Sequence, residues 1–221
     1  MLYDNKGGRM KLIYLVRHAE TEWNKERRYQ GGQDIPLSNT GVEQARQLAE
    51  RLRKVKFDLV YSSSLQRARQ TAEIIIEGNS PPIILEPAFR EINHGLWEGL
   101  RVKEITERFP REFRFWKEKP HLAKMPQGES LHDLRQRVVP RFLDLAAQEK
   151  WKRILIVGHG GVNRVILMHC LKMELRDYWK LIQNSTCVNL IDKTSQGFQV
   201  KIINDLSHLE TPPPSGYPHF Q

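Results

Sequence analysis

Hydrophobic and polar positions alternate along this chain with two different periods. Short continuous apolar runs predict buried strands at 11–16, 59–61, 83–85 and 154–157. Elsewhere apolar residues recur at spacings of three and four, which predicts amphipathic helices. Segments with that spacing lie near 41–54, 65–76, 101–109, 111–118, 130–149 and 162–171. Strands that alternate with helices predict an α/β fold, a three-layer sandwich with a mostly parallel central sheet covered by helices on both faces.

Local signals refine these elements. Thr40 and Glu43 have the spacing of a capping box at the start of the helix near 41–54. Pro140 predicts a kink in the helix near 130–149. Two further apolar runs, 187–191 and 198–203, predict a hairpin that turns at Ser195-Gln196-Gly197.

The pattern also predicts how the chain divides. Residues 1–10 are expected to form a loose leader, and the proline-rich residues 209–221 a tail without regular structure. The intervening residues, 11–208, are expected to form a single domain, a size that suits one hydrophobic core. Within it, the segment of about 100–126 is expected to form a small helical cap over the active site.

Composition is that of an ordinary globular protein, with 39% hydrophobic and 28% charged residues. No apolar run is long enough to cross a bilayer, and the first residues lack the apolar core of a signal peptide. We therefore expect a cytoplasmic protein with no membrane partner. Cys170 and Cys187 lie in apolar patterns, which predicts two reduced core thiols and no disulfide.

The net charge of +9 has two interpretations, a solvated basic surface or a field that attracts anionic substrates. The segment 101–124 interleaves basic and aromatic residues, a pattern found in nucleic-acid-binding proteins. However, Phe109, Phe113 and Trp116 recur at spacings of four and three, which describes more simply a helix that buries one face. We expect no nucleic-acid partner.

Candidate chemistry gathers where predicted strands end. Arg17 and His18 directly follow the run 11–16, and His159 follows the run 154–157 within Gly158-His159-Gly160-Gly161. In a parallel sheet, ligands bind beyond the carboxyl ends of the strands, so these side chains are expected to share one site. A neutral imidazole can attack phosphorus and carry the phosphoryl group, which makes His18 the candidate nucleophile.

A phosphoryl site needs several groups that stabilise negative charge. Arg17 has a planar guanidinium that matches phosphate oxygens, and a second arginine is available as Arg67 or Arg69 after the second strand. The helical pattern alone does not choose between these two. Gly160 would let the backbone approach an anion at a helix N-terminus.

A general acid must protonate the leaving oxygen. Glu91 is the first candidate, with Glu20 and Glu98 as rivals. The remaining histidines show no metal-binding spacing and no thiol pair accompanies them, so we expect neither a metal nor another cofactor.

These motifs resemble those of the histidine phosphatase superfamily, in the branch that contains cofactor-dependent phosphoglycerate mutases and small-molecule phosphatases. The resemblance covers residues 10–208. The matching segments are 15–21 (the histidine signature), 62–72 (the second arginine), 90–99 (the acid) and 157–161 (the second histidine). One position departs: Ala19 stands where the family usually has glycine, which removes no catalytic group.

The resemblance implies a role for each candidate. His18 would carry the phosphoryl group, Glu91 would act as proton donor, and the second-arginine motif selects Arg67. Residues implied to hold the phosphoryl group or the substrate are Arg17, Arg67, His159, Thr21, Asn24, Gln30, Gly31 and Gly160. Trp23, His94 and Trp97, together with the segment 100–126, would contact the leaving group.

The resemblance also implies a reaction. The segment from Glu91 to Ser130 is compact, and its Pro-x-Gly-Glu-Ser ending is typical of the phosphatase branch. We therefore expect a metal-independent phosphomonoesterase with a phosphohistidine intermediate, similar to α-ribazole-5′-phosphate phosphatases or broad-specificity phosphatases.

Its partner would be a small phosphate ester, and the chain would be a monomer or homodimer. The alternatives are a cofactor-dependent phosphoglycerate mutase, a nucleic-acid-binding protein and a non-catalytic scaffold. The complete set of catalytic candidates argues against the last.

Overall fold

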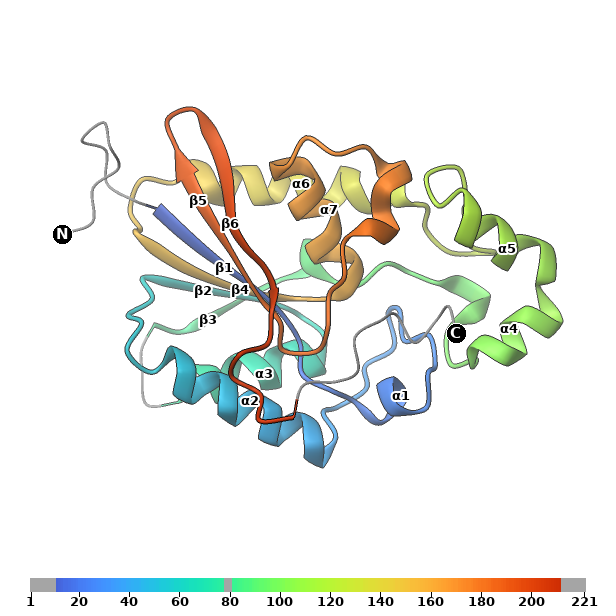
Figure 1. Ribbon diagram of the computed structural model, residues 1–221, viewed down its shortest axis with the longest axis horizontal. Helices are drawn as coiled ribbons and strands as arrows, with labels where there is room; N and C mark the ends of the chain where they lie inside the picture. Colours follow the sequence, from blue (N-terminus) through green and yellow to red (C-terminus); the bar gives the residue numbers. More distant parts are fainter. Residues whose placement is uncertain (1–10, 78–80, 212–221) are drawn as a thin grey trace.

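A computed structural model describes residues 11–77 and 81–211 (Figure 1). The predicted leader, 1–10, lies outside these residues, and so do residues 212–221 of the predicted tail.

A six-stranded sheet in the order β3-β2-β4-β1-β5-β6 forms the middle layer. The first four strands in that order are parallel, and β5 and β6 form an antiparallel hairpin beside β1. The strands are β1 (Lys11–Arg17), β2 (Leu59–Ser63), β3 (Ile83–Glu86), β4 (Arg153–Gly158), β5 (Val188–Thr194) and β6 (Gly197–Asp205). The mostly parallel α/β architecture predicted from the alternation is confirmed.

Helices cover both faces of this sheet (Figure 1). The pair α2 and α3 lies on one face and the pair α6 and α7 on the other. The helices are α1 (Glu22–Lys25), α2 (Asn39–Leu52), α3 (Gln66–Ile75), α4 (Val102–Arg108), α5 (Pro110–Glu118), α6 (Leu131–Ala147) and α7 (Gly160–Cys170). Three short 3₁₀ helices, η1 (Pro87–Phe89), η2 (Gly95–Trp97) and η3 (Leu175–Lys180), lie in the connections. None of the helices in the described ranges is both long and apolar enough to cross a membrane.

Two hydrophobic clusters, one on each face, explain why the central strands are continuously apolar. Ile13 and Leu15 of β1 pack in the cluster that contains the buried residues of α6 and α7. Val16 packs in the opposite cluster with Leu48 of α2 and Ala68 of α3. Because consecutive strand residues point to opposite faces, a strand covered on both sides must be apolar throughout.

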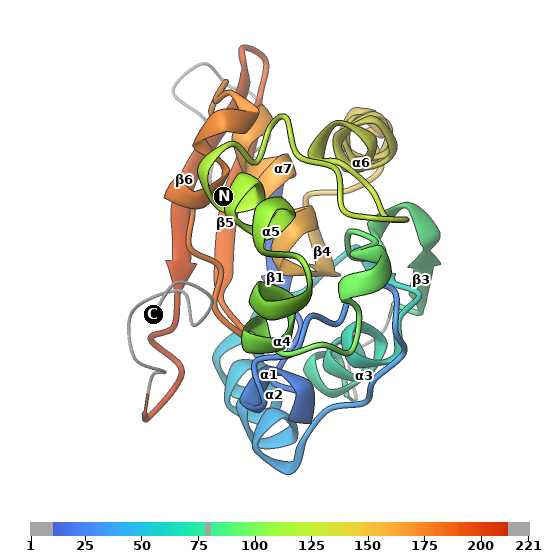
Figure 2. The same ribbon diagram turned by 90° about the vertical axis from the view of Figure 1, so that its right-hand side faces the viewer.

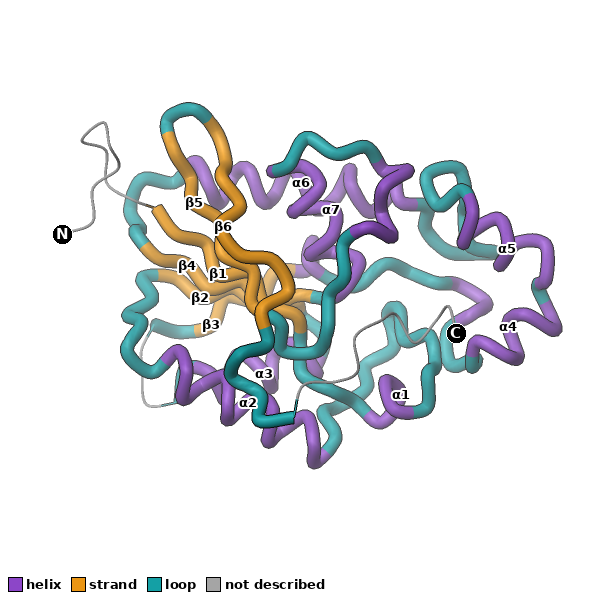
Figure 3. The backbone as a smooth tube through the Cα atoms, in the orientation of Figure 1, coloured by secondary structure: helices purple, strands orange, loops and turns teal. Residues whose placement is uncertain are grey.

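Loops and short helices gather beyond the carboxyl ends of the parallel strands (Figure 3). Viewed from that end, α4 and α5 lie in front of the sheet (Figure 2). In α5, Phe113 and Trp116 are buried in the core, and Phe109 packs partly buried against it. Phe113 and Trp116 therefore form the buried face of α5, as their spacing predicts, whereas Phe109 has non-helical backbone and lies at the junction between α4 and α5. Cys170 and Cys187 are buried free thiols.

The start of α2 corrects one prediction. The N-cap is Ser38, whose Oγ accepts a hydrogen bond from the Gly41 N–H at 3.0 Å. Thr40 lies inside the first turn and is exposed, so the capping box predicted from Thr40 and Glu43 is wrong. Tertiary contacts hold Ser38 in this position, because its N–H donates to the Glu20 carbonyl at 2.9 Å and its hydroxyl donates to the Glu20 carboxylate at 3.2 Å.

Replacing the cap residue tests this assignment. The Ser38→Ala variant is expected to lose about 1 kcal/mol of unfolding free energy, since an orphan N–H at the helix start loses its acceptor. The Thr40→Ala variant should be neutral or slightly stabilising, because alanine is the better helix former. Urea denaturation of both variants and the parent measures the difference. A larger loss in Thr40→Ala would place the cap where the sequence pattern had predicted it.

Candidate active site

Parallel pairing of β1 with β4 brings two histidines together. Arg17 is in register with Gly158, and the His18 N–H donates to the Gly158 carbonyl at 3.0 Å. The next residue on each strand is a histidine, and the His18 and His159 rings lie 5.1 Å apart between centroids. Both side chains are buried. The sheet therefore assembles one site from residues that are distant in sequence.

A backbone carbonyl fixes the tautomer of His18. Its Nδ1 lies 2.7 Å from the carbonyl oxygen of Ala19, and a carbonyl only accepts, so Nδ1 carries the hydrogen. In the neutral ring, Nε2 then has a free lone pair. Burial lowers the pKa of His18 well below its ordinary value, and the positive charges of Arg67 and Arg17 lower it further. The imidazole is thus held in its neutral, nucleophilic form.

Arg17 and Arg67 are oriented by backbone carbonyl groups. Arg17 Nη1 donates to the Gln183 carbonyl at 2.6 Å. Arg67 donates from Nη1 to the Gln33 carbonyl at 2.6 Å and from Nη2 to the Gly31 carbonyl at 2.8 Å. Within residues 11–77 and 81–211, neither guanidinium forms an ion pair with a carboxylate. Burial lowers the pKa of Arg67 to about 10, so it stays protonated at neutral pH and its charge remains available to an anion.

The structure separates the two arginines between which the helical pattern did not choose. Arg67 is fully buried and lines the cavity. Arg69 lies on the exposed side of α3 and pairs with Glu73 at 3.5 Å. Only Arg67 of this pair reaches the site.

Among the three candidate acids, only Glu91 lines the cavity. Its carboxylate accepts the Gly161 N–H, at 3.1 Å to each oxygen, and the Ile92 N–H at 2.9 Å. Glu98 instead accepts the N–H groups of Gly32 and His94, and Glu20 accepts the Ser38 hydroxyl. Gly161 is required here, since a Cβ would lie 2.5 Å from Glu91 Oε1.

His159 is anchored by the neighbouring strand. Its Nε2 lies 2.8 Å from the hydroxyl of Ser63 at the end of β2. Its Nδ1 is buried and, among the described residues, has no hydrogen-bond partner. Burial, followed by the charge of Arg67, lowers the pKa of His159 well below its ordinary value. This ring lies against His18, but His159 is not itself among the residues that line the cavity.

The other predicted contact residues divide into two groups. Gln30, Gly31, His94 and Gly160 line the cavity. Thr21, Trp23, Asn24 and Trp97 do not.

Local packing explains the second group. Thr21 and Asn24 form the capping box of α1, and the Thr21 hydroxyl donates to Asn24 Oδ1 at 3.0 Å. The Trp23 ring lies against Gly99. Trp97 is buried in the core beside Tyr29 and Phe113.

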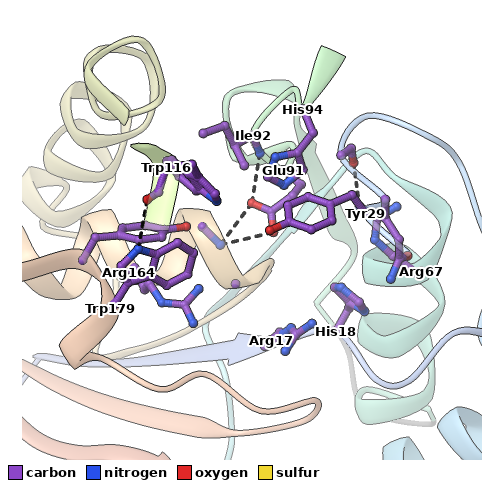
Figure 4. A pocket seen from close by; sticks show the side chains of 15 residues that line it. Arg17, His18, Tyr29, Arg67, Glu91, Ile92, His94, Trp116, Arg164 and Trp179 are labelled. Carbon is purple, nitrogen blue, oxygen red and sulfur yellow. Dashed lines mark hydrogen bonds between the residues drawn. The ribbon is translucent and has the colours of Figure 1, made fainter. Parts of the chain in front are cut away.

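Residues that the sequence did not single out complete the lining. They are Tyr29, Ile92, Arg164, Tyr178 and Trp179 (Figure 4). Trp116, from the segment 100–126, and Gly161, from the second histidine motif, also line the cavity. The aromatic residues in this set have the sequence pattern of core residues, so the sequence did not identify them as site residues. Arg164 did carry a signal, because it is a charged residue within the apolar run of α7.

The resulting cavity has a volume of about 70 Å³, enough for a few water molecules. His18, Arg17 and Arg67 lie at its base, and Glu91 points between them and the aromatic residues (Figure 4). No group of three or more His, Cys, Asp or Glu side chains in the described part of the chain is arranged to hold a metal ion.

An α/β sheet with a buried, cationic, histidine-bearing pocket at its carboxyl edge defines a class of proteins built to bind phosphoryl groups. Comparison with known proteins supports this assignment. The sequence profile of the histidine phosphatase superfamily (branch 1) matches residues 13–206. The chain belongs to this superfamily and is an enzyme of its phosphatase and mutase type.

Individual relatives carry several activities in their names. The chain is 36% identical over 201 residues to phosphoserine phosphatase 1 of Hydrogenobacter thermophilus, covering 90% of this chain and 94% of the relative. It is 34% identical over 208 residues to the probable phosphoglycerate mutase GpmB of an Enterobacter species, covering 92% and 97%. The structure of the α-ribazole phosphatase from Shigella flexneri superimposes with a TM-score of 0.82 at 28% identity, covering 88% of this chain and 96% of that one.

The protonation state of His18 can be measured directly. In an NMR titration of the free protein, the His18 imidazole is expected to titrate below 6.5, because burial and two guanidinium groups oppose its charged form. The Arg67→Met variant should raise that pKa, since it removes the larger of the two charge effects, whereas Arg69→Met should leave it unchanged. A His18 pKa at or above 6.5, or no rise in Arg67→Met, would contradict this electrostatic picture.

Proposed function

We propose that this protein is a metal-independent phosphomonoesterase that acts on a small phosphorylated metabolite through a phosphohistidine at His18. The observation that carries this proposal is that the His18 imidazole, with its Nδ1 bonded to the Ala19 carbonyl, lines one cavity together with the guanidinium groups of Arg17 and Arg67 and the Glu91 carboxylate. The domain responsible would be residues 11–208, with the segment of about 100–126 as its cap.

The first half-reaction follows from these positions. The phosphate oxygens of the ester would bind Arg17, Arg67 and the free Nδ1 of His159, which stabilise charge as it develops. His18 Nε2 attacks phosphorus, the bond between phosphorus and the leaving oxygen breaks, and protonated Glu91 gives its proton to that oxygen. The products are the free alcohol and phosphohistidine.

The second half-reaction returns the enzyme to its starting state. The Glu91 carboxylate takes a proton from a water molecule, whose oxygen attacks phosphorus. The bond between phosphorus and Nε2 then breaks, so inorganic phosphate and neutral His18 result. Two displacements with lower activation barriers thus replace one displacement with a high barrier.

The candidate substrates are an α-ribazole 5′-phosphate-type ester or a broader set of small esters. The α-ribazole phosphatase and the phosphoserine phosphatase among the relatives support hydrolysis. The modest volume of the cavity favours compact leaving groups.

Phosphoglycerate mutation is the alternative, and the GpmB relative supports it. A mutase must keep water from its phosphohistidine long enough to return the phosphoryl group to a second oxygen. The compact segment from Glu91 to Ser130, which resembles that of the phosphatase branch, favours hydrolysis.

Phosphate release from a panel of esters tests the nucleophile. With a chelator present, the wild type should release phosphate from α-ribazole phosphate, phosphoserine, phosphoglycerates, sugar phosphates or p-nitrophenyl phosphate. The His18→Ala variant should lose at least about 10³-fold in kcat/KM while remaining folded. Activity near the wild-type level in His18→Ala would exclude this nucleophile, and loss with chelator that a divalent ion restores would overturn the metal-free mechanism. Interconversion of phosphoglycerates without phosphate release would identify the mutase.

The Glu91→Gln variant tests the acid. It should slow esters of poor leaving groups by roughly 10²- to 10⁴-fold, because an amide cannot supply the proton. An activated aryl ester needs little protonation, so its phosphorylation of His18 should slow much less in single-turnover kinetics. Glu98→Gln, at the neighbouring carboxylate outside the cavity, is the matched control. Equal slowing of both ester classes in Glu91→Gln would contradict the assignment.

A further inference from the structure

A third arginine, Arg164 of α7, lines the cavity. Its side chain is only 2% exposed. Its Nε donates to the Leu181 carbonyl at 2.7 Å, and its guanidinium group hydrogen-bonds the Tyr178 hydroxyl. The guanidinium carbon lies 5.0 Å from the centre of the Tyr178 ring and 5.8 Å from that of Trp179. These contacts hold the cation rigidly at the cavity wall.

Arg164 lies on the other side of Glu91 from the proposed nucleophile. In Figure 4, Arg164, Trp116 and Trp179 lie to one side of Glu91, and His18 and Arg67 lie to the other. Gly161 lies close to both Glu91 and Tyr178, because a Cβ at this position would lie 2.5 Å from Glu91 Oε1 and 3.2 Å from the Tyr178 hydroxyl. The Tyr178 hydroxyl therefore lies near the Glu91 carboxylate, and Arg164 packs on the Tyr178 ring.

This position has a consequence for the substrate. A general acid contacts the leaving oxygen, so the space beyond Glu91, away from His18, is where the rest of the leaving group must lie. Trp116 and Trp179 lie on that side of the cavity (Figure 4), and the Tyr178 ring lies against the Arg164 guanidinium. Arg164 supplies a positive charge on a wall that is otherwise aromatic or apolar.

The positive charge of Arg164 and the aromatic surface around it favour one kind of ligand. Burying a guanidinium is costly, and the cost is recovered best by a desolvated anion with matching geometry. A carboxylate matches the planar guanidinium fork, and their attraction is stronger here than in water because the surroundings are of low polarity. Flat aromatic faces suit the short carbon skeleton between the carboxylate and the ester oxygen.

We propose that Arg164, held by Tyr178 and Leu181, binds a carboxylate of the leaving group and makes the enzyme selective for small phosphate esters of hydroxy acids. This inference rests on the proposed phosphatase function and narrows it to one substrate class. Arg164 is then a specificity-determining residue, while Arg17 and Arg67 bind the phosphoryl group.

Two pairs of esters test the inference on the wild-type enzyme. Phosphoserine and phosphoethanolamine differ only by a carboxylate, and 3-phosphoglycerate and glycerol 3-phosphate differ by a carboxylate in place of a hydroxymethyl group. The acid of each pair should have the higher kcat/KM, by on the order of 10- to 100-fold, the range of one charged hydrogen-bonded contact. Equal kcat/KM values within both pairs would overturn the proposal.

Variants then assign the preference to Arg164. Arg164→Met should reduce kcat/KM for phosphoserine toward that for phosphoethanolamine, and should change the latter little. Arg164→Lys should retain part of the preference, since it keeps the charge without the fork. Arg69→Met, which removes an exposed arginine from α3, is the matched control and should keep all of it. Loss of both substrates in equal proportion from a folded Arg164→Met protein would contradict a role in specificity.

A binding measurement separates this inference from the phosphatase proposal. Calorimetry with the His18→Ala variant, which retains Arg164, should show tighter binding of phosphoserine than of phosphoethanolamine. If no ester of the panel is hydrolysed in a His18-dependent manner, the proposed function fails, and the calorimetric difference still decides whether Arg164 binds carboxylates. If Arg164→Met does not fold, the wild-type ester pairs and this binding difference decide alone, and equal affinities would overturn the inference.

Discussion

The constraint on which the site depends is a pair of guanidinium groups, Arg67 buried and Arg17 partly buried, whose side-chain hydrogen bonds within the described residues go to backbone carbonyls. A carboxylate partner would neutralise Arg17 or Arg67, whereas a carbonyl oxygen orients the group and leaves its net charge in place. Buried positive charge is unfavourable, so the surrounding structure must hold it. The same charge keeps His18 neutral and prepares the cavity for an anion. These charges thus lower the folding stability locally, and they provide an electrostatic field that is already oriented before an anion binds.

The carbonyl that holds Arg17 is positioned by neutral amides. Gln183 Oε1 accepts from Asn189 Nδ2 at 2.8 Å, and Gln183 Nε2 donates to Asn189 Oδ1 at 2.9 Å. Asn189 Nδ2 also donates to the Leu15 carbonyl at 2.9 Å, which ties the pair to β1. Because amides carry no charge, this network fixes the arginine without cancelling its field. The antiparallel strand β5 therefore supports a site built on its parallel neighbours.

Several parts of the site could be predicted from residue order alone. A charged or histidine residue directly after an apolar strand is unusual for packing, so Arg17, His18 and His159 stood out. The helical spacing did contain a signal, because Arg67 lies four residues before Thr71 on the buried face of α3 and Arg69 does not lie on that face. The Gly31 and Gln33 carbonyls that orient Arg67 lie in a distant loop, which no helical pattern reports. The cap of α2 was misassigned because the hydrogen bonds that hold Ser38 to Glu20 are tertiary.

The sequence by itself determined the alternation of strands and helices, the burial of the central strands on both faces and the chemistry placed at their ends. These are consequences of local periodicity and of which residue follows which. The sequence motifs already favoured Glu91, and the structure places it in the cavity, whereas only the tertiary structure decided that aromatic side chains from α5 and η3 form the cavity wall. It also decided that Arg164 faces that cavity. Contacts between segments far apart in the chain depend on three-dimensional packing, and a one-dimensional pattern does not contain them.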